Sequence, residues 1–342
     1  MDAPQPSFGQ RLRDNWLELL LLLIFVAALV WIASTARDVW QAVAAVPTET
    51  PTAVPTATPA QPAGTQAVET PGLPLGNTFD GRQAAMLAEE MVSAGPRVVG
   101  TEEHTAAVGQ LISELRQSGW GLQQQSFTAD EVQHTNIIAR AGSGDVIVVA
   151  THYDTSPVSD LDPDEANRPT PSPGANDGGS GPAVLLELAR SLDKDRLNGQ
   201  VWLAFLDGRY APLSADGANQ VADSGVSTLA EALPENVKAV IWVDLAGDPD
   251  QRFTIVPNGD PQVAADLWAV AEQLGYARWF VQETGATSDS SVQVFSDRGI
   301  PSTAITDPSY AFLRTTGDTS DKLSSDSLER VGRVLEVYLE QQ

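Results

Sequence analysis

The sequence of 342 residues contains no cysteine, so it can form neither disulfide bonds nor thiolate metal sites. Histidine is almost as scarce, because His104, His134 and His152 are the three in the chain and none follows position 152. Any metal site must therefore use nitrogen and oxygen ligands, and carboxylates must supply most of them.

Positive charge is also sparse. Lys and Arg together number 20 against 45 Asp and Glu, which gives a formal net charge of −25. Nucleic acid and anionic lipid surfaces would repel such a chain, so we expect no nucleic-acid partner. The simplest interpretation of the acidity is a well-solvated surface. Hydrophobic residues make up 42% of the sequence, which suffices for the core of one domain of about 250–280 residues.

The first 77 residues differ in composition from the remainder. A short polar tail, residues 1–15, precedes an apolar segment, residues 16–36. Within this segment Leu17–Ala36 is about 20 residues long, which is enough to span a bilayer. A cleavable signal sequence has a shorter apolar core of about 7–15 residues, so we expect an uncleaved membrane anchor. Cleavage after Ala42-Val43-Ala44 is the alternative.

Residues 37–77 are rich in Pro, Thr and Ala, a composition that cannot build a packed core and that predicts a disordered stalk. Arg11 and Arg13 precede the apolar segment and Arg37 follows it, which favours an N-terminus in the cytoplasm. We therefore expect a cytoplasmic tail, one span through the lipid bilayer, a stalk and an extracytoplasmic domain at residues 78–342, on the cell surface.

The densest run of motifs lies between Asp145 and Gly181. Val146–Ala150 is short, apolar and β-branched, which predicts a buried strand that delivers Thr151-His152-Tyr153-Asp154 to its C-terminal end. A Pro-rich loop leads to Gly174-Ala175-Asn176-Asp177-Gly178-Gly179-Ser180-Gly181. Imidazole and carboxylate are zinc ligands, so His152 and Asp177 are candidate ligands, and Asp154 is suited to orient the His152 ring from behind.

These two motifs, H-Y-D-T and G-A-N-D-G-G-S-G at this spacing, resemble the co-catalytic zinc aminopeptidases and their relatives the glutaminyl cyclases (metallopeptidase family 28). The order of helices and strands, with T-N-I-I-A-R before the central strand, is similar to that family over about residues 80–342. The resemblance implies an α/β domain of three layers, helix, sheet and helix, with a mostly parallel central sheet.

Hydrophobic periodicity predicts the same fold class, because strands that alternate with helices form largely parallel sheets. We expect helices at Asp80–Ala94, Glu102–Ser118, Ala183–Leu192, Pro261–Leu274 and Leu328–Leu339. We expect strands at Gly121–Phe127, Thr135–Ala139, Val146–Ala150, Gln200–Leu206, Val237–Leu245 and Thr303–Ile305. His104 and His134 match no ligand of the family, and we expect them at the surface or at a sheet edge.

The resemblance implies a site of two metals around a bridging carboxylate. In the family one metal takes the His of H-x-D, the bridging Asp and a later Asp at a strand end. His152, Asp177 and Asp244 match these three positions in the present chain. Both metals of such a site act as Lewis acids and supply a nucleophilic water near neutral pH.

The ligands of the second metal are not kept. In the family it takes the bridging Asp, the second Glu of an E-E pair and a late His, while the first Glu is the general base. Here Arg209 and Tyr210 stand at the two Glu positions, and Arg314 stands at the late His before a T-x-x-D-T run. Since no histidine follows position 152, none can replace the late ligand. We therefore expect at most one zinc ion per chain, or none.

Two interpretations of the site remain open. In the first, His152, Asp177 and Asp244 hold one zinc with water as the fourth ligand, and Asp207 serves as a substitute base. Alternatively, Asp207 is a structural turn residue that points away from the site. In the second, no metal binds, and Arg209 and Arg314 occupy the space of the second metal and neutralise Asp177.

We favour the second interpretation. It describes a membrane-anchored, catalytically degenerate member of the zinc aminopeptidase family that keeps a cleft for a peptide or another small molecule. An active one-metal aminopeptidase that removes N-terminal residues from peptides is the competing hypothesis. A surface scaffold or interaction domain with no ligand in the cleft is the third.

Overall fold

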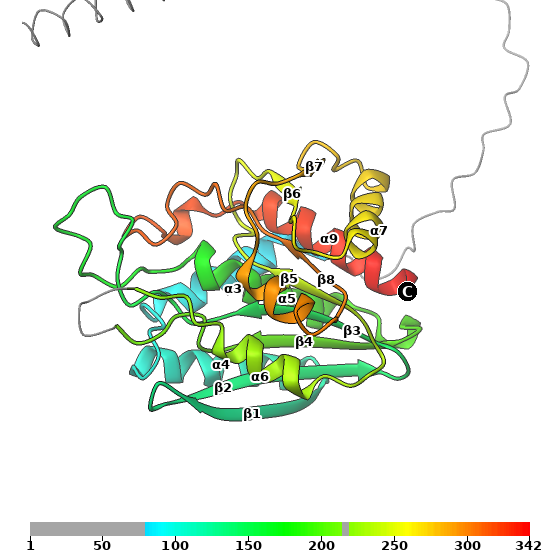
Figure 1. Ribbon diagram of the computed structural model, residues 1–342, viewed down its shortest axis with the longest axis horizontal. Helices are drawn as coiled ribbons and strands as arrows, with labels where there is room; N and C mark the ends of the chain where they lie inside the picture. Colours follow the sequence, from blue (N-terminus) through cyan, green and yellow to red (C-terminus); the bar gives the residue numbers. More distant parts are fainter. Residues whose placement is uncertain (1–78, 214–218) are drawn as a thin grey trace, which may run out of the picture. The chain divides into compact units, whose positions relative to one another are not determined.

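A six-stranded sheet forms the centre of the domain in the computed structural model, which describes residues 79–213 and 219–342 (Figure 1). The strand order is β1-β2-β4-β3-β5-β8. β3 is parallel to β4 and β5, and β5 to β8, while β2 is antiparallel to β1 and β4. The strands are β1 (Gly121–Ala129), β2 (Val132–Gly142), β3 (Val146–His152), β4 (Gln200–Leu206), β5 (Val237–Val243) and β8 (Ser302–Ile305).

Helices cover both faces of the sheet and produce the three expected layers (Figure 1). One face packs against α3 (Gly81–Ser93), α4 (Glu102–Gln117), α5 (Gly181–Ser191), α7 (Pro261–Gln273) and α9 (Ser325–Gln341). The other packs against α6 (Ser224–Ala232) and α8 (Ser290–Ser296). Side chains alternate along a strand, so Ile147 and Val149 of β3 join the first layer, and Val148 and Ala150 join the second. This double burial explains why β3 is apolar throughout.

Each helix and strand expected from the periodicity is present, with ends that differ by a few residues. The periodicity did not predict the helices α6 and α8. It also missed the strands β6 (Phe253–Ile255) and β7 (Phe280–Thr284), and these two strands form a separate parallel sheet. Strands of three to five residues are too short to display a hydrophobic period. Three single turns complete the fold: η1 (Asn176–Ser180), η2 (Lys194–Arg196) and η3 (Ser320–Lys322).

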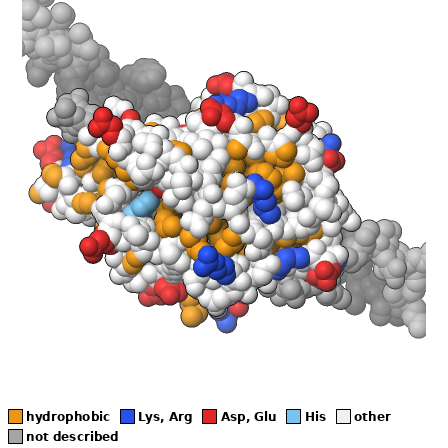
Figure 2. All heavy atoms as spheres, turned by 90° about the horizontal axis from the view of Figure 1, so that it is seen from below, with side chains coloured by type: hydrophobic (Ala, Val, Ile, Leu, Met, Phe, Trp, Pro, Cys, Tyr) orange, Lys and Arg blue, Asp and Glu red, His pale blue; other side chains and the backbone are white. Residues whose placement is uncertain are grey.

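One edge of the sheet is the strand β1, whose exposed side is polar. It carries Gln123, Gln124 and Ser126, and such an edge discourages pairing with another chain. Figure 2 shows the face seen from below in Figure 1, on the side of β1 and β2. Hydrophobic side chains gather there between a few Lys and Arg side chains, and Asp and Glu lie mainly around the rim. The net acidic charge is thus unevenly distributed over the domain surface.

No helix within residues 79–213 and 219–342 is long and apolar enough to cross a membrane. The expected tail, anchor and stalk, at residues 1–15, 16–36 and 37–77, lie outside the described residues. Their assignment therefore stays a prediction from the sequence.

Two helical glycines provide a matched test of this packing. A Cβ at Gly332 of α9 would collide with the ring of Phe79, whereas nothing lies within 4 Å of a Cβ at Gly109 of α4. Alanine is favoured over glycine by about 1 kcal/mol in a helix interior, and overpacking a core costs about 1–3 kcal/mol. We expect Gly109→Ala to raise the melting temperature and Gly332→Ala to lower it in thermal unfolding followed by circular dichroism. Shifts of the same sign in both variants would contradict the packing.

Candidate metal centre

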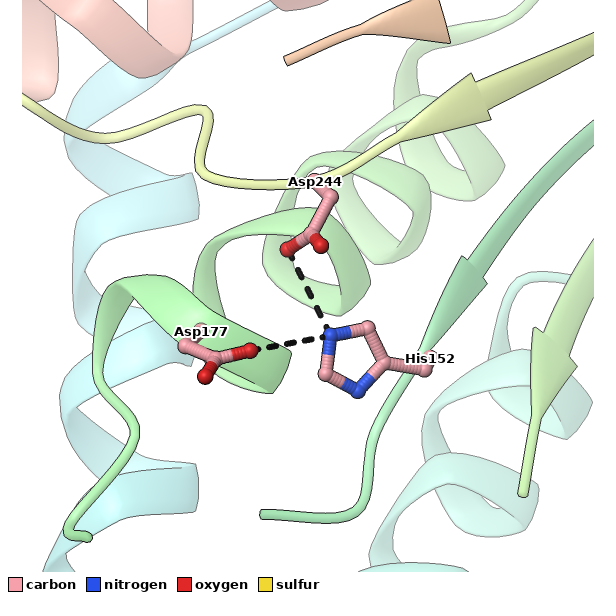
Figure 3. Close-up of side chains that lie close together, drawn as sticks. All are labelled: His152, Asp177 and Asp244. Atoms are coloured by element: carbon pink, nitrogen blue, oxygen red, sulfur yellow. Dashed lines mark ion pairs between the residues drawn. The ribbon is translucent and has the colours of Figure 1, made fainter. Parts of the chain in front are cut away.

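The structure brings one histidine and two aspartates together at the C-terminal edge of the sheet (Figure 3). His152 ends β3, Asp244 directly follows β5, and Asp177 lies in η1. In the parallel pairing of β3 and β5, Ala150 lies opposite Trp242, so the register places His152 level with Asp244. The Nε2 atom of His152 is 3.2 Å from Asp177 Oδ1 and 3.4 Å from Asp244 Oδ1. All three side chains are buried.

The orientation of the His152 ring is set from its other nitrogen. Nδ1 lies 3.0 Å from the backbone oxygen of Asp154, and since a carbonyl can only accept, Nδ1 carries the hydrogen. The lone pair of Nε2 then faces the two carboxylates of the site. Asp154 was expected to orient this ring. Its backbone oxygen is closer to Nδ1 than its carboxylate is, because the carboxylate Oδ1 lies 3.4 Å from Nδ1. Trp242 stacks on the ring with centroids 6.0 Å apart.

The turn that carries Asp177 requires glycine at the next position. Gly178 has φ +83°, in the left-handed region, and a Cβ there would collide with the backbone oxygen of Asp154. The turn is also held by Asp318, whose Oδ1 accepts from the Asn176 amide at 2.8 Å and whose Oδ2 accepts from the Asp177 amide at 3.1 Å. Burial, together with the charge of Asp177, raises the pKa of Asp318 to about 6.

Arg97 links the end of β3 to the same turn. Its guanidinium is fully buried and donates to the backbone oxygens of Tyr153 at 3.0 Å and Pro173 at 3.2 Å, and to that of Gly174. Burial lowers the pKa of Arg97 to about 10, so it remains a cation at neutral pH among the nearby carboxylates. The sequence analysis assigned no role to Arg97 or Asp318, although the G-P-R and T-x-x-D-T runs that hold them were the available signals.

The donor set fits a metal ion. Among residues 79–213 and 219–342, His152, Asp177 and Asp244 are the group of His, Asp or Glu side chains whose ligand atoms lie close enough, within 4.8 Å of one another. Tetrahedral zinc with bonds of about 2.0–2.1 Å separates its ligand atoms by about 3.4 Å, which matches the His–Asp distances. Nε2 of His152 is buried and has no hydrogen-bond partner in the described part of the chain, and a metal ion would satisfy it.

The surroundings of His152 favour its protonated form when no metal ion is bound. Burial disfavours a charged imidazole, but the carboxylates of Asp244, Asp154 and Asp177 outweigh it and raise the pKa of His152 well above its ordinary value. Burial alone would raise the pKa of Asp177, but contacts with His152 and Tyr210 lower it. Metal binding must therefore release a proton, and affinity for metal should increase with pH.

A family model agrees with this geometry. Residues 136–339, more than half of the chain, match Peptidase family M28. The chain belongs to peptidase family M28. Two fungal relatives, each named as a probable zinc metalloprotease, come from Pyrenophora tritici-repentis and Pyrenophora teres f. teres and are 33% identical over 151 residues. The match covers 41% of this chain and 29% of each relative, so the chain spans about three-tenths of their length.

Solved structures of the same kind resemble the domain over nearly their whole length. A Zn-dependent exopeptidase from Parabacteroides distasonis is 26% identical with a TM-score of 0.72, and the match covers 79% of this chain and 100% of that one. The Porphyromonas gingivalis glutaminyl cyclase is 28% identical with a TM-score of 0.70, over 78% of this chain and 99% of that one. A Bacteroides thetaiotaomicron glutaminyl cyclase, solved with N-acetylhistamine bound, is 25% identical with a TM-score of 0.69, and the match covers 78% of this chain and 99% of that one.

In this M28 chain a phenol occupies the second side of the bridging carboxylate. The hydroxyl of Tyr210, at the position of the second family Glu, donates to Asp177 Oδ2 at 2.6 Å. Both residues are buried. The backbone amide of Tyr210 donates to Asp154 Oδ2 at 2.9 Å, which fixes the tyrosine next to the H-x-D motif. A neutral donor therefore satisfies the oxygen that would bridge to a second metal.

The expectation that Arg209 and Arg314 neutralise Asp177 holds only in part, because the charge of Arg209 helps to lower the pKa of Asp177 but the ion pairs of both arginines go to other carboxylates. Nη1 of Arg209 pairs with Asp223 Oδ1 at 2.7 Å, and Nη2 of Arg314 pairs with Asp160 Oδ2 at 3.3 Å. The second oxygen of Asp177 accepts from Tyr210 instead.

Asp207 belongs to a separate buried cluster. Its oxygens accept from the Thr135 and Gly208 amides, both at 2.8 Å, and lie 2.9 Å from His104 Nε2 and 3.5 Å from His134 Nδ1. Burial opposes its ionisation, but these contacts hold the pKa of Asp207 well below its ordinary value. The expectation of exposed histidines is wrong, because both are buried around this carboxylate. None of these contacts reaches the metal ligands, so the structure favours the turn-residue role.

Asp207→Asn separates a structural role from a role as base. The pKa of Asp207 is lower in the folded than in the unfolded protein, where it is about 3.9. The ionised carboxylate therefore stabilises the folded protein above that pH, and this stabilisation is lost as the pH falls below it. At pH 7 we expect the variant to lose about 3 kcal/mol of unfolding free energy in urea titrations and to bind metal with unchanged stoichiometry. Asp145→Asn, at an exposed carboxylate that pairs with Lys238, is the matched control and should change little. Unchanged stability with altered metal content or turnover would contradict the structural role.

Proposed function

We propose that this M28 domain binds one zinc ion through His152, Asp177 and Asp244 and recognises a small ligand beside it without peptidase turnover. The hydrogen bond from Tyr210 to Asp177 Oδ2 carries this proposal. Oδ1 of Asp177 faces Nε2 of His152, and Oδ2 is taken by the phenol. The phenol therefore competes with a second metal for Oδ2 of Asp177.

The residue at the family's general-base position cannot act as a base. When bound, zinc supplies Lewis acidity and an activated water, and hydrolysis also needs a group that accepts the proton of that water. Arg209 stands where the family has its base. Burial opposes its charge, but Asp223, Asp289 and Asp244 raise the pKa of Arg209 well above its ordinary value, so it cannot accept a proton. Loss of a general base alone typically removes about 10²–10⁴ in rate.

A pocket of about 320 Å³ lined by Asp177 and Asp244 supports the binding part of the proposal. Its walls mix charged, hydroxyl and apolar groups, as ligand sites commonly do. They include Asp177, Arg209, Tyr210, Asp244, Thr254, Val256, Thr306, Leu313 and Arg314.

An active one-metal peptidase is the second candidate. The close approach of the three ligand atoms favours it, because three protein ligands and one open position form a recognised catalytic zinc geometry. The solved relatives include a zinc exopeptidase and glutaminyl cyclases. The two candidates differ in turnover rather than in metal content.

Elemental analysis and an aminoacyl-nitroanilide assay test both candidates on the purified chain. We expect about one zinc per chain, its loss in Asp177→Ala, its retention in Tyr210→Phe, and no hydrolysis above background. Restoring the family residues in the triple variant Arg209→Glu, Tyr210→Glu, Arg314→His should add a second zinc and raise hydrolysis by about 10²-fold or more. Wild-type hydrolysis that disappears in Asp177→Ala would establish the one-metal peptidase, and absence of zinc would contradict metal binding altogether.

We also propose that residues 16–36 anchor the domain in the membrane, with the domain outside the cytoplasm. The length and apolar composition of this segment support the proposal. We expect the full chain to remain in the membrane fraction after alkaline carbonate extraction, and protease added to intact cells to degrade the domain. A variant that lacks residues 1–36 is the control and should be absent from the membrane fraction. Carbonate release of the full chain would contradict the anchor, and protection of the domain would contradict its orientation.

A further inference from the structure

The two arginines that replace family residues line one pocket together with the metal ligands. Arg209 and Arg314 both border it, as do Asp177, Tyr210 and Asp244. The replacements exchange a carboxylate and an imidazole for two permanent cations. The chemistry of the pocket wall is therefore changed even though the three candidate ligands are kept.

Each guanidinium has one terminal nitrogen, Nη2 of Arg209 and Nη1 of Arg314, that makes no hydrogen bond in the described part of the chain. In the described part of the chain, the Arg209 guanidinium makes its hydrogen bonds through Nη1, to Asp223 at 2.7 Å, Ser290 at 3.1 Å and Ser291 at 2.7 Å. Its Nε is buried without a partner in the described part of the chain. Arg314 has its ion pair with Asp160 through Nη2, and its Nε is likewise buried and unpartnered among residues 79–213 and 219–342.

Both arginines are held in place by the protein. The hydroxyls of Ser290 and Ser291 also donate to Asp223, at 2.6 and 3.1 Å, so the partner of Arg209 is itself fixed, and Trp242 lies 5.6 Å from its guanidinium carbon. Arg314 has φ +49°, and a residue other than glycine in such a backbone conformation costs about 1 kcal/mol or more. Such strain is tolerated most often where a side chain serves a site.

The guanidinium groups on the pocket wall suit a carboxylate. With zinc bound, the two charges of the ion would be balanced by Asp177 and Asp244. The wall adds Arg209 and Arg314, which are paired with Asp223 and Asp160, and the carboxylate of Asp289. A carboxylate can bind an arginine through two parallel hydrogen bonds, whereas a free α-amino group is itself a cation and a donor and can make no such bonds to it.

We propose that this pocket recognises the free carboxylate of a short peptide, with Arg209 as its main contact and Arg314 as the second. The proposal rests on the proposed function of a ligand-binding M28 domain and specifies the class of ligand. A volume of about 320 Å³ is at the small end of the range for ligand pockets, about 300–1,000 Å³, which limits the bound part to a chain end. Val256 and Leu313 on the wall provide apolar surface for the side chain of the terminal residue.

Four versions of one dipeptide separate the two chain ends. Isothermal titration calorimetry of the full chain would use Ala-Leu, acetyl-Ala-Leu, Ala-Leu-amide and acetyl-Ala-Leu-amide, with zinc-loaded and with chelator-treated protein. We expect the two free acids to bind at least about tenfold more tightly than the two amides, because charged hydrogen bonds to arginine are lost in the amides. Acetylation of the N-terminus should have little effect.

Three variants assign the preference to the arginines. Arg209→Met should abolish the preference for the acid. Arg209→Lys keeps the charge and the pair with Asp223 but lacks the planar guanidinium, so it should reduce the preference. The Lys variant also provides the test if the Met variant fails to fold. Arg314→Asn should reduce it as well, and asparagine accepts the left-handed backbone there. Arg298→Met removes one positive charge outside the pocket, at an exposed pair with Glu231, and should leave the preference unchanged.

The outcomes distinguish this inference from the one-zinc proposal. Equal binding of acids and amides, tighter binding of the free amines, or no binding of any of the four peptides would overturn carboxylate recognition. If the protein holds no zinc but the preference for the acid persists and depends on Arg209, the inference stands and the one-zinc proposal fails. If one zinc binds and no preference is seen, the one-zinc proposal stands and the inference fails.

Discussion

The two oxygens of Asp177 have different partners, and this difference determines what the site can hold. Oδ1 lies 3.2 Å from Nε2 of His152, in the position of a metal ligand, and Oδ2 accepts the hydroxyl of Tyr210 at 2.6 Å. A buried carboxylate needs both oxygens satisfied, and a phenol meets this need without adding a charge. In the one-zinc proposal, Tyr210 accounts for why Asp177 would act as a ligand of one metal rather than as a bridge between two.

The remaining structure serves mainly to hold that carboxylate in position. Asp318 binds the amides of Asn176 and Asp177, and Arg97 ties the preceding turn to the end of β3. The parallel register of β3 and β5 then brings Asp244 to the same point. The site depends on contacts between segments that are far apart in the chain, so its geometry is a property of the folded core and not of any single motif.

The arginines have separate roles from the tyrosine. Neither forms an ion pair with Asp177 in the described part of the chain, since their ion pairs go to Asp223 and Asp160, although the charge of Arg209 helps to lower the pKa of Asp177. They change the pocket wall instead and leave cationic donors beside the candidate metal site.

The sequence by itself determined the α/β fold and most element positions, because hydrophobic periodicity depends on neighbouring residues, and its resemblance to the zinc aminopeptidases pointed to the three candidate ligands. It also excluded a late histidine ligand, since no histidine follows His152. Only the tertiary structure decided which group satisfies Asp177, where Arg209 and Arg314 point, and that His104 and His134 are buried around Asp207. The physical reason is that the partner of a buried polar or charged group is chosen among segments that meet only after folding, and local sequence carries no record of those distances.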